Sequence, residues 1–511
     1  MGKQKWLHKL DWSLTGLLGI LMSIRIFHIG LGGESRIVRN VPDDAYYYLT
    51  LARNAAKSGI WSFDGQSTSS GFHLFFGYFL RGLYTFFPKI SLTEIFFVAS
   101  TISVLLLCAA FLITLRLIKH FFGFKFVLVG LLPFFTISYL IQSTLLMESS
   151  FAIFASALSI HFFFKNRNLN IRTAILLVVV GLFGTLARSD YGLLPAVSAL
   201  VLLALNRKNK IFQAAQSMWI LIGALIGEVL YTASDYLISG RFTQGSAQIK
   251  LHWSSVQGLD FRAPFSTVVE SVFPWFQNFG KFEKLLIMIL IIGLIVFRRK
   301  KIANFLSLKS EFTIAIISGL TLFSYVIFYG FNSAGFQAWY IANLVVPTAI
   351  FTAALFKFFS TPKSALLVFS GAILISNHII TAVDYEPYPH QTNMLRVAKE
   401  LNKITPERIG AWNSGIYGFY NSGKVVNLDG LVNDQAIPYI VHNKLFEYLK
   451  SEKISHLVDF GNMFTNSEIR RRGGYDETNF EKCFHPREEI DTSESWSGEG
   501  IWEYSLVSTC E

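Results

Sequence analysis

The chain has 511 residues, of which 52% are hydrophobic and only 15% are charged. A soluble single domain does not need that much apolar surface, so the composition excludes an ordinary soluble enzyme. The formal net charge is +11, yet the basic residues stand in short clusters between apolar runs and not along one stretch. This distribution argues against nucleic acid as a partner and is typical of membrane proteins.

Long apolar runs recur along the chain. Segments such as 104–115, 174–186 and 285–296 contain no Asp, Glu, Lys or Arg. A membrane-spanning helix takes roughly 20 largely apolar residues, because its backbone groups must pair within the helix where no water is present. By this rule the sequence predicts an α-helical polytopic membrane protein with about 11 transmembrane helices. Their predicted ranges are 12–30, 92–117, 126–142, 149–164, 173–187, 191–205, 212–238, 283–297, 311–329, 340–356 and 364–383.

The loops between these helices differ in charge, and every second loop carries a cluster of Lys and Arg. Loops of this kind stay in the cytoplasm, so the N-terminus is predicted to be cytoplasmic and the first apolar run to be a retained signal anchor. The basic loops are expected to touch anionic membrane lipid. An odd number of spans then places residues 384–511 on the exterior.

The chain divides into two predicted parts. Residues 1–383 form the membrane module, which includes two long exterior segments at 31–90 and 239–282. Residues 384–511 contain no spanning run and are rich in Asn, Asp, Glu and Gly. Short strands are predicted there at 408–412, 424–428 and 454–460, and helices at 391–401 and 443–450. We therefore expect a C-terminal exterior α/β domain.

The most informative exterior segment follows the first span. From Asp43 onward, apolar residues recur at Tyr47, Leu51 and Ala55, which predicts an amphipathic helix. Asp43 or Asp44 would cap its N-terminus, and its aromatic face would lie in the membrane interface. On a purely structural interpretation, the two carboxylates do nothing more than cap this helix.

The chain continues with SFDG at 62–65 and SSGFHLFF at 69–76. An acidic pair after the first span, followed by a Tyr pair, SFDG and GFH, resembles the first exterior loop of the GT-C fold glycosyltransferases. These enzymes use polyprenyl-phosphate sugars and include protein mannosyltransferases, lipid A aminoarabinose transferases and mycobacterial arabinofuranosyltransferases. The usual family form of the last element is TNGFHPLW, so this chain departs from it at the Asn, Pro and Trp.

Further elements resemble the family in the same order along the chain. They are LLMESS at 145–150, LARSD at 186–190, SGRFTQGSAQIK at 239–250, WY at 339–340 and parts of 408–434. Gln244 stands where the family usually has Pro. These elements extend along most of the chain. Their order and their common position on the predicted exterior side make the resemblance specific.

The resemblance implies an inverting transfer of a sugar from a polyprenyl-phosphate donor to an acceptor hydroxyl of a glycan, lipid or protein. It places the reaction at the exterior face of the bacterial inner membrane. Asp43 is implied as general base, Asp44 as its orienting or acceptor-binding partner, and Glu148 as a further catalytic carboxylate. Donor phosphate would be bound by Arg188, Arg241 and Lys250. Substrate contacts are implied for Tyr47, His73, Asp190, Ser246, Trp339 and Tyr340.

Structural alternatives exist for several of these residues. Arg188 and Asp190 can neutralise each other at a helix end, and Glu148 can begin a helix. Arg241 and Lys250 can snorkel toward the membrane interface. At the level of the whole chain, one alternative is a non-catalytic membrane assembly factor whose tail binds a partner, and the main competing class is a transporter or flippase of lipid-linked sugars. Such proteins usually show inverted repeats and charges near mid-membrane, which this sequence lacks.

No cofactor is certain from the sequence. A divalent cation (Mg²⁺, Mn²⁺ or Ca²⁺) at Asp43 and Asp44 stays open, since hard cations take oxygen ligands. The sequence has no His or Cys spacing typical of zinc and no glycine-rich nucleotide motif, which argues against nucleotide-sugar donors. Cys483 and Cys510 both lie in the tail, where an oxidising exterior would permit the disulfide that we predict between them.

Overall fold

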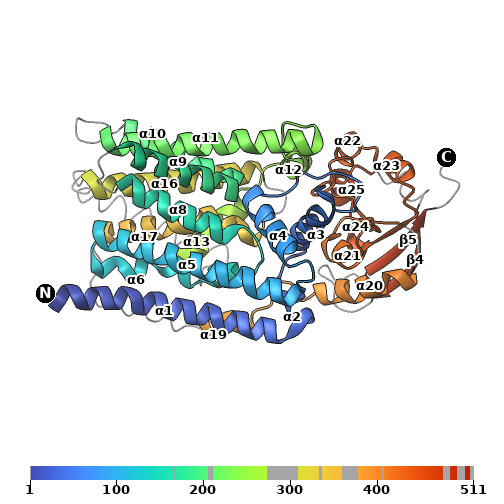
Figure 1. Cartoon of the computed structure of the whole chain (residues 1–511), viewed down its shortest axis with the longest axis horizontal. Helices are drawn as coiled ribbons and strands as arrows, with labels where there is room; N and C mark the ends of the chain where they lie inside the picture. Colours follow the sequence, from blue (N-terminus) through green and yellow to red (C-terminus); the bar gives the residue numbers. More distant parts are fainter. Residues whose placement is uncertain are drawn as a thin grey trace, which may run out of the picture.

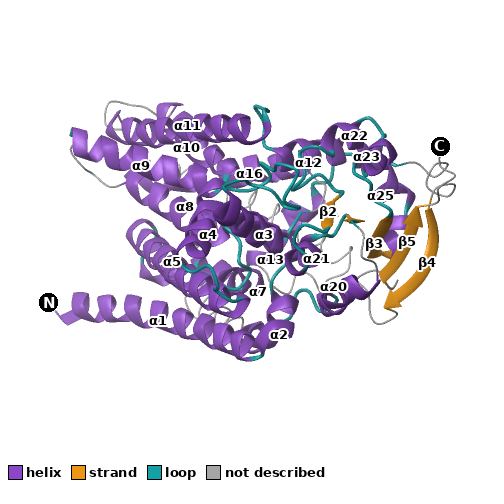
Figure 2. Ribbon diagram, turned by 45° about the vertical axis from the view of Figure 1, so that its right-hand side comes forward, coloured by secondary structure: helices purple, strands orange, loops and turns teal. Residues whose placement is uncertain are grey.

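The protein consists of a helical bundle with a mixed α/β tail at one end of it (Figure 1). The N-terminus lies at the end of the bundle that is far from the tail, and helices α3, α4 and α12 lie between the two parts (Figure 2). The computed structural model describes residues 2–164, 169–204, 211–272, 309–332, 336–359, 378–404, 408–475, 484–491 and 501–506.

Among the described residues, four helices of the bundle are long and apolar enough to cross a membrane. They are α1 (Gly2–Leu31), α5 (Leu92–Phe121), α11 (Ile211–Ser239) and α16 (Lys309–Phe331). Shorter apolar helices pack among them: α8 (Ser149–Phe164), α9 (Ile171–Ala187), α10 (Leu193–Ala204) and α17 (Val345–Phe359). These eight helices agree with the predicted apolar segments, because each is built from a run that can satisfy its backbone groups only internally.

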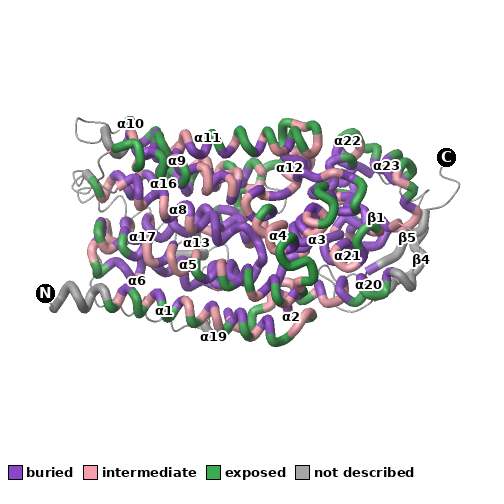
Figure 3. Tube along the Cα trace, in the orientation of Figure 1, coloured by how far each residue is buried: buried purple, intermediate pink, exposed green. Residues whose placement is uncertain are grey.

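Large apolar side chains remain exposed on the outer faces of the bundle, as the exposed stretches of α5, α11 and α16 in Figure 3 illustrate. Leu105, Val229 and Phe323 are 65%, 67% and 61% exposed, respectively. Such a surface is costly in water and is expected where lipid tails are the solvent. The polar side chains of the exterior segments, in contrast, gather at the junction with the tail.

The prediction of one continuous helix at 126–142 is wrong. The structure breaks it into α6 (Val127–Gly130), a 3₁₀ turn (Leu132–Phe135) and α7 (Ile137–Leu140). Pro133 has no N–H to continue the helix, and the hydroxyl of Thr136 caps the next turn by accepting the N–H of Tyr139. The segment predicted at 283–297, and that at 364–383 as far as residue 377, lie outside the described residues.

The two long segments predicted to be exterior contain α2 (Gly33–Asn40), α3 (Asp43–Ser58), α4 (Leu74–Phe86), α12 (Gly245–Gln257) and α13 (Arg262–Val272). Helix α3 begins at Asp43 as predicted, but the expectation that it lies in the membrane interface is wrong. Every residue from Ala45 to Ala52 is buried, because α3 packs between α4 and the tail helix α21. The predicted carboxylate cap is also wrong, since Pro42 is the N-cap and makes no side-chain cap bond.

A five-stranded sheet organises the tail, in the order β2-β1-β3-β5-β4. Strands β1 (Ile409–Ala411), β2 (Val425–Asn427) and β3 (His456–Phe460) are parallel, as a buried strand run flanked by helices suggests. Strands β4 (Phe484–Asp491) and β5 (Ile501–Leu506) are antiparallel and were not predicted from the sequence. The helices of the tail include α20 (Gln391–Ile404), α21 (Gly415–Tyr420), α22 (Ile437–Val441), α23 (Leu445–Ser451), α24 (Gly461–Thr465) and α25 (Ser467–Arg472).

The connection from the bundle into the tail is fixed by a buried arginine of α1. Arg25 donates to the carbonyl oxygens of Ala382 at 2.5 Å and Tyr385 at 2.9 Å, and to Asn40 Oδ1 at 2.7 Å. The two carbonyls stand at the end of α19 (His378–Asp384), where a cation is favourable. These bonds tie α1, the chain just before Asp43 and the start of the tail together.

Candidate active site

Two cavities meet where the bundle and the tail join, and Lys250 lines both. Cavity A has a volume of about 360 Å³ and is bounded by α3, α12 and the tail. Cavity B has a volume of about 290 Å³ and is bounded by α12 and the adjoining ends of the bundle helices. The lining of cavity A includes Asp44, Tyr47, Trp253, Trp412, Asp429 and Arg472. The lining of cavity B includes His73, Arg188, Asp190, Ser246, Tyr329 and Tyr340.

The two adjacent carboxylates of α3 point to different partners. Asp43 lines neither cavity, and its two oxygens accept the backbone N–H groups of Gly415 at 2.9 Å and Ile416 at 2.7 Å. These donors form the first turn of α21, so Asp43 fastens the tail to α3. Burial raises the pKa of the Asp43 carboxyl to about 7, although both N–H donors oppose that shift.

Asp44 is the α3 carboxylate that faces cavity A. It is only half-buried, and burial together with the negative charge of Glu148 raises its pKa, whereas Lys250 lowers it. A carboxylate with a raised pKa holds a proton more readily than an ordinary one, which suits proton uptake from a hydroxyl. The pKa of Asp43 is raised as well, so what distinguishes Asp44 is that it lines a cavity, whereas Asp43 lines neither.

The tail supplies a second carboxylate to cavity A. Asp429 follows β2, and its oxygens accept the phenol O–H of Tyr47 at 3.2 Å and the N–H of Leu431 at 2.7 Å. Burial raises the pKa of Asp429 to about 7. The phenol of Tyr47 also lies 3.0 Å from the carbonyl oxygen of Trp412. Tyr47 is thus brought to the cavity as predicted, in contact with tail residues that sequence reasoning did not single out.

A buried ion cluster stands beside cavity B. The Arg188 guanidinium donates to Glu148 at 2.6 Å and, through two nitrogens, to Asp190 at 3.0 and 2.8 Å. Glu148 is fully buried and lines neither cavity, so its position fits a structural ion pair and not a catalytic carboxylate. Tyr329 and Asn343 each donate to Asp190 at 2.6 Å. With one guanidinium facing two carboxylates, the cluster is net negative.

His73 lies against this cluster in a neutral state. Burial lowers the pKa of its imidazole to about 4. The distance of 3.6 Å between its Nε2 and the Glu148 carboxylate is therefore a polar contact and no ion pair at neutral pH. Its Nδ1 lies 3.1 Å from the Tyr231 hydroxyl, which also accepts the N–H of Leu74.

Lys250 is the cation that both cavities share. Its ammonium donates to the Tyr340 hydroxyl at 2.5 Å and lies 5.1 Å from the centre of that ring. The Arg188 guanidinium lies 5.3 Å from the same centre, so Tyr340 stands next to both cations. Burial lowers the pKa of Lys250, but Tyr340 and Asp44 outweigh that effect, and the pKa is raised. Lys250 is thus charged, and Tyr340 is its hydrogen-bond partner among the described side chains.

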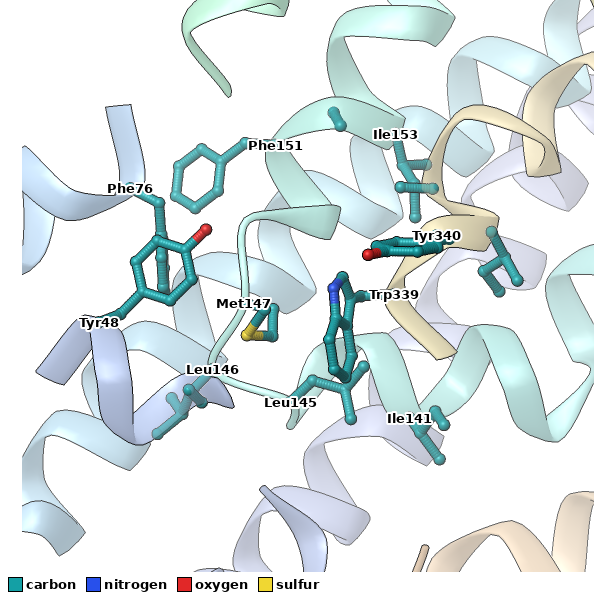
Figure 4. Packing of buried hydrophobic residues seen from close by; sticks show 14 of the residues in the cluster. Tyr48, Phe76, Ile141, Leu145, Leu146, Met147, Phe151, Ile153, Trp339 and Tyr340 are labelled. Atoms are coloured by element: carbon teal, nitrogen blue, oxygen red, sulfur yellow. The ribbon is translucent and has the colours of Figure 1, made fainter. Parts of the chain in front are cut away.

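Among the remaining predicted residues, Ser246 lines a cavity, whereas Arg241 and Trp339 do not. Arg241 is outside both and donates to Gln248 at 3.0 Å. Trp339 is buried in the apolar core, where Figure 4 shows it beside Leu145 and Met147. Ser246 lines cavity B from the first turn of α12. Cys483 and Cys510 lie outside the described residues, so their disulfide stays a prediction.

The divalent cation that the sequence leaves open at Asp43 and Asp44 does not fit the observed arrangement. Both oxygens of Asp43 already accept backbone N–H groups, which leaves Asp44 as the one member of the pair that faces a cavity. Within the described ranges, no group of three or more His, Cys, Asp or Glu side chains is placed to hold a metal ion. We derive no step of the reaction through a metal.

Solved structures with the same overall fold identify the architecture. Over 97% of this chain and 99% of the other, the structure is similar to ArnT from Cupriavidus metallidurans bound to undecaprenyl phosphate, with a TM-score of 0.55 and 12% identity. It is also similar to the oligosaccharyltransferase AglB from Archaeoglobus fulgidus in complex with an inhibitory peptide and a dolichol-phosphate. That similarity covers 94% of this chain and 73% of the other, with a TM-score of 0.51 and 14% identity.

Both neighbours are GT-C fold enzymes, and this chain has that fold. It is a multi-pass membrane protein. No protein-family model matches its sequence, and none of the curated proteins matches it either.

Proposed function

We propose that this protein is an integral-membrane glycosyltransferase. It would move a sugar from a polyprenyl-phosphate donor to an acceptor hydroxyl at the exterior face of the bacterial inner membrane. The observation that carries the proposal is the position of Lys250, which lines both the cavity with the Asp44 carboxylate and the cavity next to the bundle helices. The GT-C fold supports the same class of reaction.

The donor phosphate belongs in cavity B. A phosphate anion needs a cation that is not already neutralised, and Arg188 faces two carboxylates. Lys250 is the better candidate, because its observed partner is the neutral Tyr340 hydroxyl. Arg188 and Lys250 lie beside the same Tyr340 ring, and Arg188 would influence the phosphate site from that position. Arg241 lines neither cavity, so it is left out of this contact.

In the chemical step the acceptor lies in cavity A and the donor phosphate in cavity B, and Lys250 lines both cavities. The acceptor oxygen attacks the anomeric carbon, its proton goes to Asp44, and the bond from that carbon to the phosphate oxygen breaks. The phosphate leaves with the bonding electrons as a stable anion, so it needs no general acid. A single displacement of this kind inverts the anomeric centre. The raised pKa of Asp44 is suited to accepting the proton.

The test is a strain that lacks this protein. Loss of a transferase removes one saccharide from the cell envelope and leaves the unused lipid-linked donor in the exterior leaflet. Loss of a flippase, the competing class, leaves the donor in the cytoplasmic leaflet. Mass spectrometry of envelope glycans, with leaflet-specific labelling of the lipid-linked sugar, separates the two. An unchanged set of glycans, glycolipids and glycoproteins refutes both.

A further inference from the structure

The tail contributes one wall of cavity A, and that wall is formed at one edge of its sheet. Trp412 and Asn413 follow β1, Asp429 and Leu431 follow β2, and Met463 comes shortly after β3. These three strands are parallel, so their carboxyl ends meet at the same edge. In α/β sheets this edge is where ligands bind. The tail therefore presents its ligand-binding edge to Asp44.

The edge is held in place from both sides of the junction. Asp459, at the end of β3, accepts the backbone N–H groups of Trp412 and Asn413 and the side-chain amide of Asn413, each at 2.8 Å. From the bundle side, Asp43 holds α21 and Tyr47 holds Asp429. Groups fixed in this way keep their directions without help from a ligand, which is what a specific recognition site needs.

The wall carries polar groups that have capacity left for a ligand. The Arg472 guanidinium lies 5.3 Å from the centre of the Trp253 ring, and a guanidinium has five N–H donors. Asn413 offers its amide oxygen, since its side-chain N–H is the group that bonds to Asp459. Asp429 accepts from Tyr47, Leu431 and Asn427, and a carboxylate has about four acceptor positions, so it can accept a further bond.

This set of groups matches the chemistry of a sugar ring. Sugar hydroxyls both donate and accept, so they pair with carboxylates, amides and guanidinium groups together. The C–H faces of the ring pack on the electron-rich face of an aromatic side chain, here Trp253. A lipid acceptor would leave the polar side chains of the tail wall, among them Asn413, Asp429 and Arg472, without partners. An extended peptide would need unpaired backbone groups, whereas Asp459 takes the N–H groups at this edge.

We propose that the acceptor is a carbohydrate, and that the tail recognises its terminal ring in cavity A through Asn413, Asp429 and Arg472. The inference rests on the proposed function and narrows it to one acceptor class. The tail is then the part of the protein that selects the acceptor, while α3 and α12 supply the base and the donor-binding cation.

The experiment places a photoreactive benzophenone residue in the full-length protein in its own cells. Gln257 lines cavity A from the end of α12 and is the test position. Val441, 39% exposed on α22 and outside the cavity, is the matched control position. After irradiation, mass spectrometry of the purified protein identifies the chemical class of the adduct. We expect an adduct with the mass increments of sugar residues at Gln257 and none at Val441.

Two variants link that adduct to the tail wall. Asn413→Ala and Arg472→Ala should each lower the adduct yield at Gln257 at least about tenfold, the effect of losing hydrogen bonds to a ligand. Glu447→Gln, an exposed carboxylate on α23, should leave it unchanged. Thermal unfolding of each variant verifies that it is folded. A lower adduct yield in either folded variant is enough to link the adduct to the tail wall.

Several outcomes overturn the proposal. They are a peptide or lipid adduct at Gln257, a yield no higher than at Val441, or a saccharide adduct that neither tail variant reduces. The proposed function fails independently of these results. If the crosslink gives a saccharide adduct but the deletion strain keeps every envelope glycan, the transferase function is refuted. If the crosslink gives a peptide adduct and the deletion strain lacks a saccharide, only the acceptor class is refuted.

Discussion

The neighbouring carboxylates of α3 allow a test in which two similar substitutions have opposite consequences. Asp44→Asn keeps the shape of the side chain but removes the group that can take a proton. No hydrogen bond of the Asp44 side chain is found among the described residues, and its ionised form is disfavoured by burial. The fold should therefore tolerate the change. Loss of a positioned base lowers the rate by about 10²–10⁴-fold, or about 2.7–5.5 kcal/mol in the activation free energy.

Asp43→Asn should behave differently. The Asn amide can accept with one oxygen, so one of the N–H groups of Gly415 and Ile416 loses its partner. The loss of a charge-assisted hydrogen bond of this kind costs about 1.5–3 kcal/mol, and it weakens the contact between α3 and the tail. Sugar transfer should fall by less than about tenfold as long as the tail stays docked.

The assay complements the deletion strain with each variant at matched protein level and measures the missing saccharide by mass spectrometry. Thermal unfolding of the purified proteins reports the stability. The expected pattern is an inactive, stable Asp44→Asn protein and an active, less stable Asp43→Asn protein. The reverse pattern, with transfer lost in folded Asp43→Asn and retained in Asp44→Asn, would refute the assignment of the base and return it to Asp43.

Four further predictions follow from the same contacts. Lys250→Ala should weaken the binding of undecaprenyl phosphate in nanodiscs by about 10- to 150-fold, whereas Arg241→Ala should not, and equal effects of both would contradict the donor site. Glu148→Gln removes one charge-assisted hydrogen bond of Arg188 but leaves its pair with Asp190, and it should destabilise the protein by about 1.5–3 kcal/mol, measured as a lower unfolding midpoint. Burial raises the pKa of Asp429 from an unfolded value near 3.8 to about 7, so its contribution to stability falls as the pH rises from about 4 to about 7. Asp429→Asn should remove this part of the pH dependence of unfolding, and an unchanged pH profile would exclude it as the cause. A reporter that is active only outside the cytoplasm should be active when fused to the C-terminus, and activity of a cytoplasmic reporter there would overturn the topology.

The membrane character and most of the helices could be predicted from the sequence because they depend on local composition. A run such as 104–115 must be helical in lipid whatever surrounds it. The parallel strands of the tail were also predictable, since short β-branched runs between helical patterns are typical of such sheets. In contrast, the segment 126–142 has the right composition for a span, and it is Pro133 together with the cap at Thr136 that breaks it.

The surroundings of α3 illustrate what sequence could not determine. Its apolar stripe is equally suited to a membrane surface and to a protein surface, because burial against either removes the same area from water. Only the tertiary structure shows that its partners are α4 and α21. Asp43 and Asp44 likewise cannot be told apart from the sequence. In the structure, Asp43 accepts N–H groups of the tail helix α21, whereas Asp44 faces a cavity.

The sequence by itself determined which residue types were available in the loops between the helices and in which order. It did not determine which of them meet, since Asp44, Lys250 and Asp429 are separated by about two hundred residues at each step. Their meeting depends on packing between α3, α12 and the carboxyl edge of a sheet, which are contacts between distant parts of the chain. Local pattern carries no information on such contacts, so the tail wall of cavity A, and with it the proposed acceptor site, was decided by the tertiary structure alone.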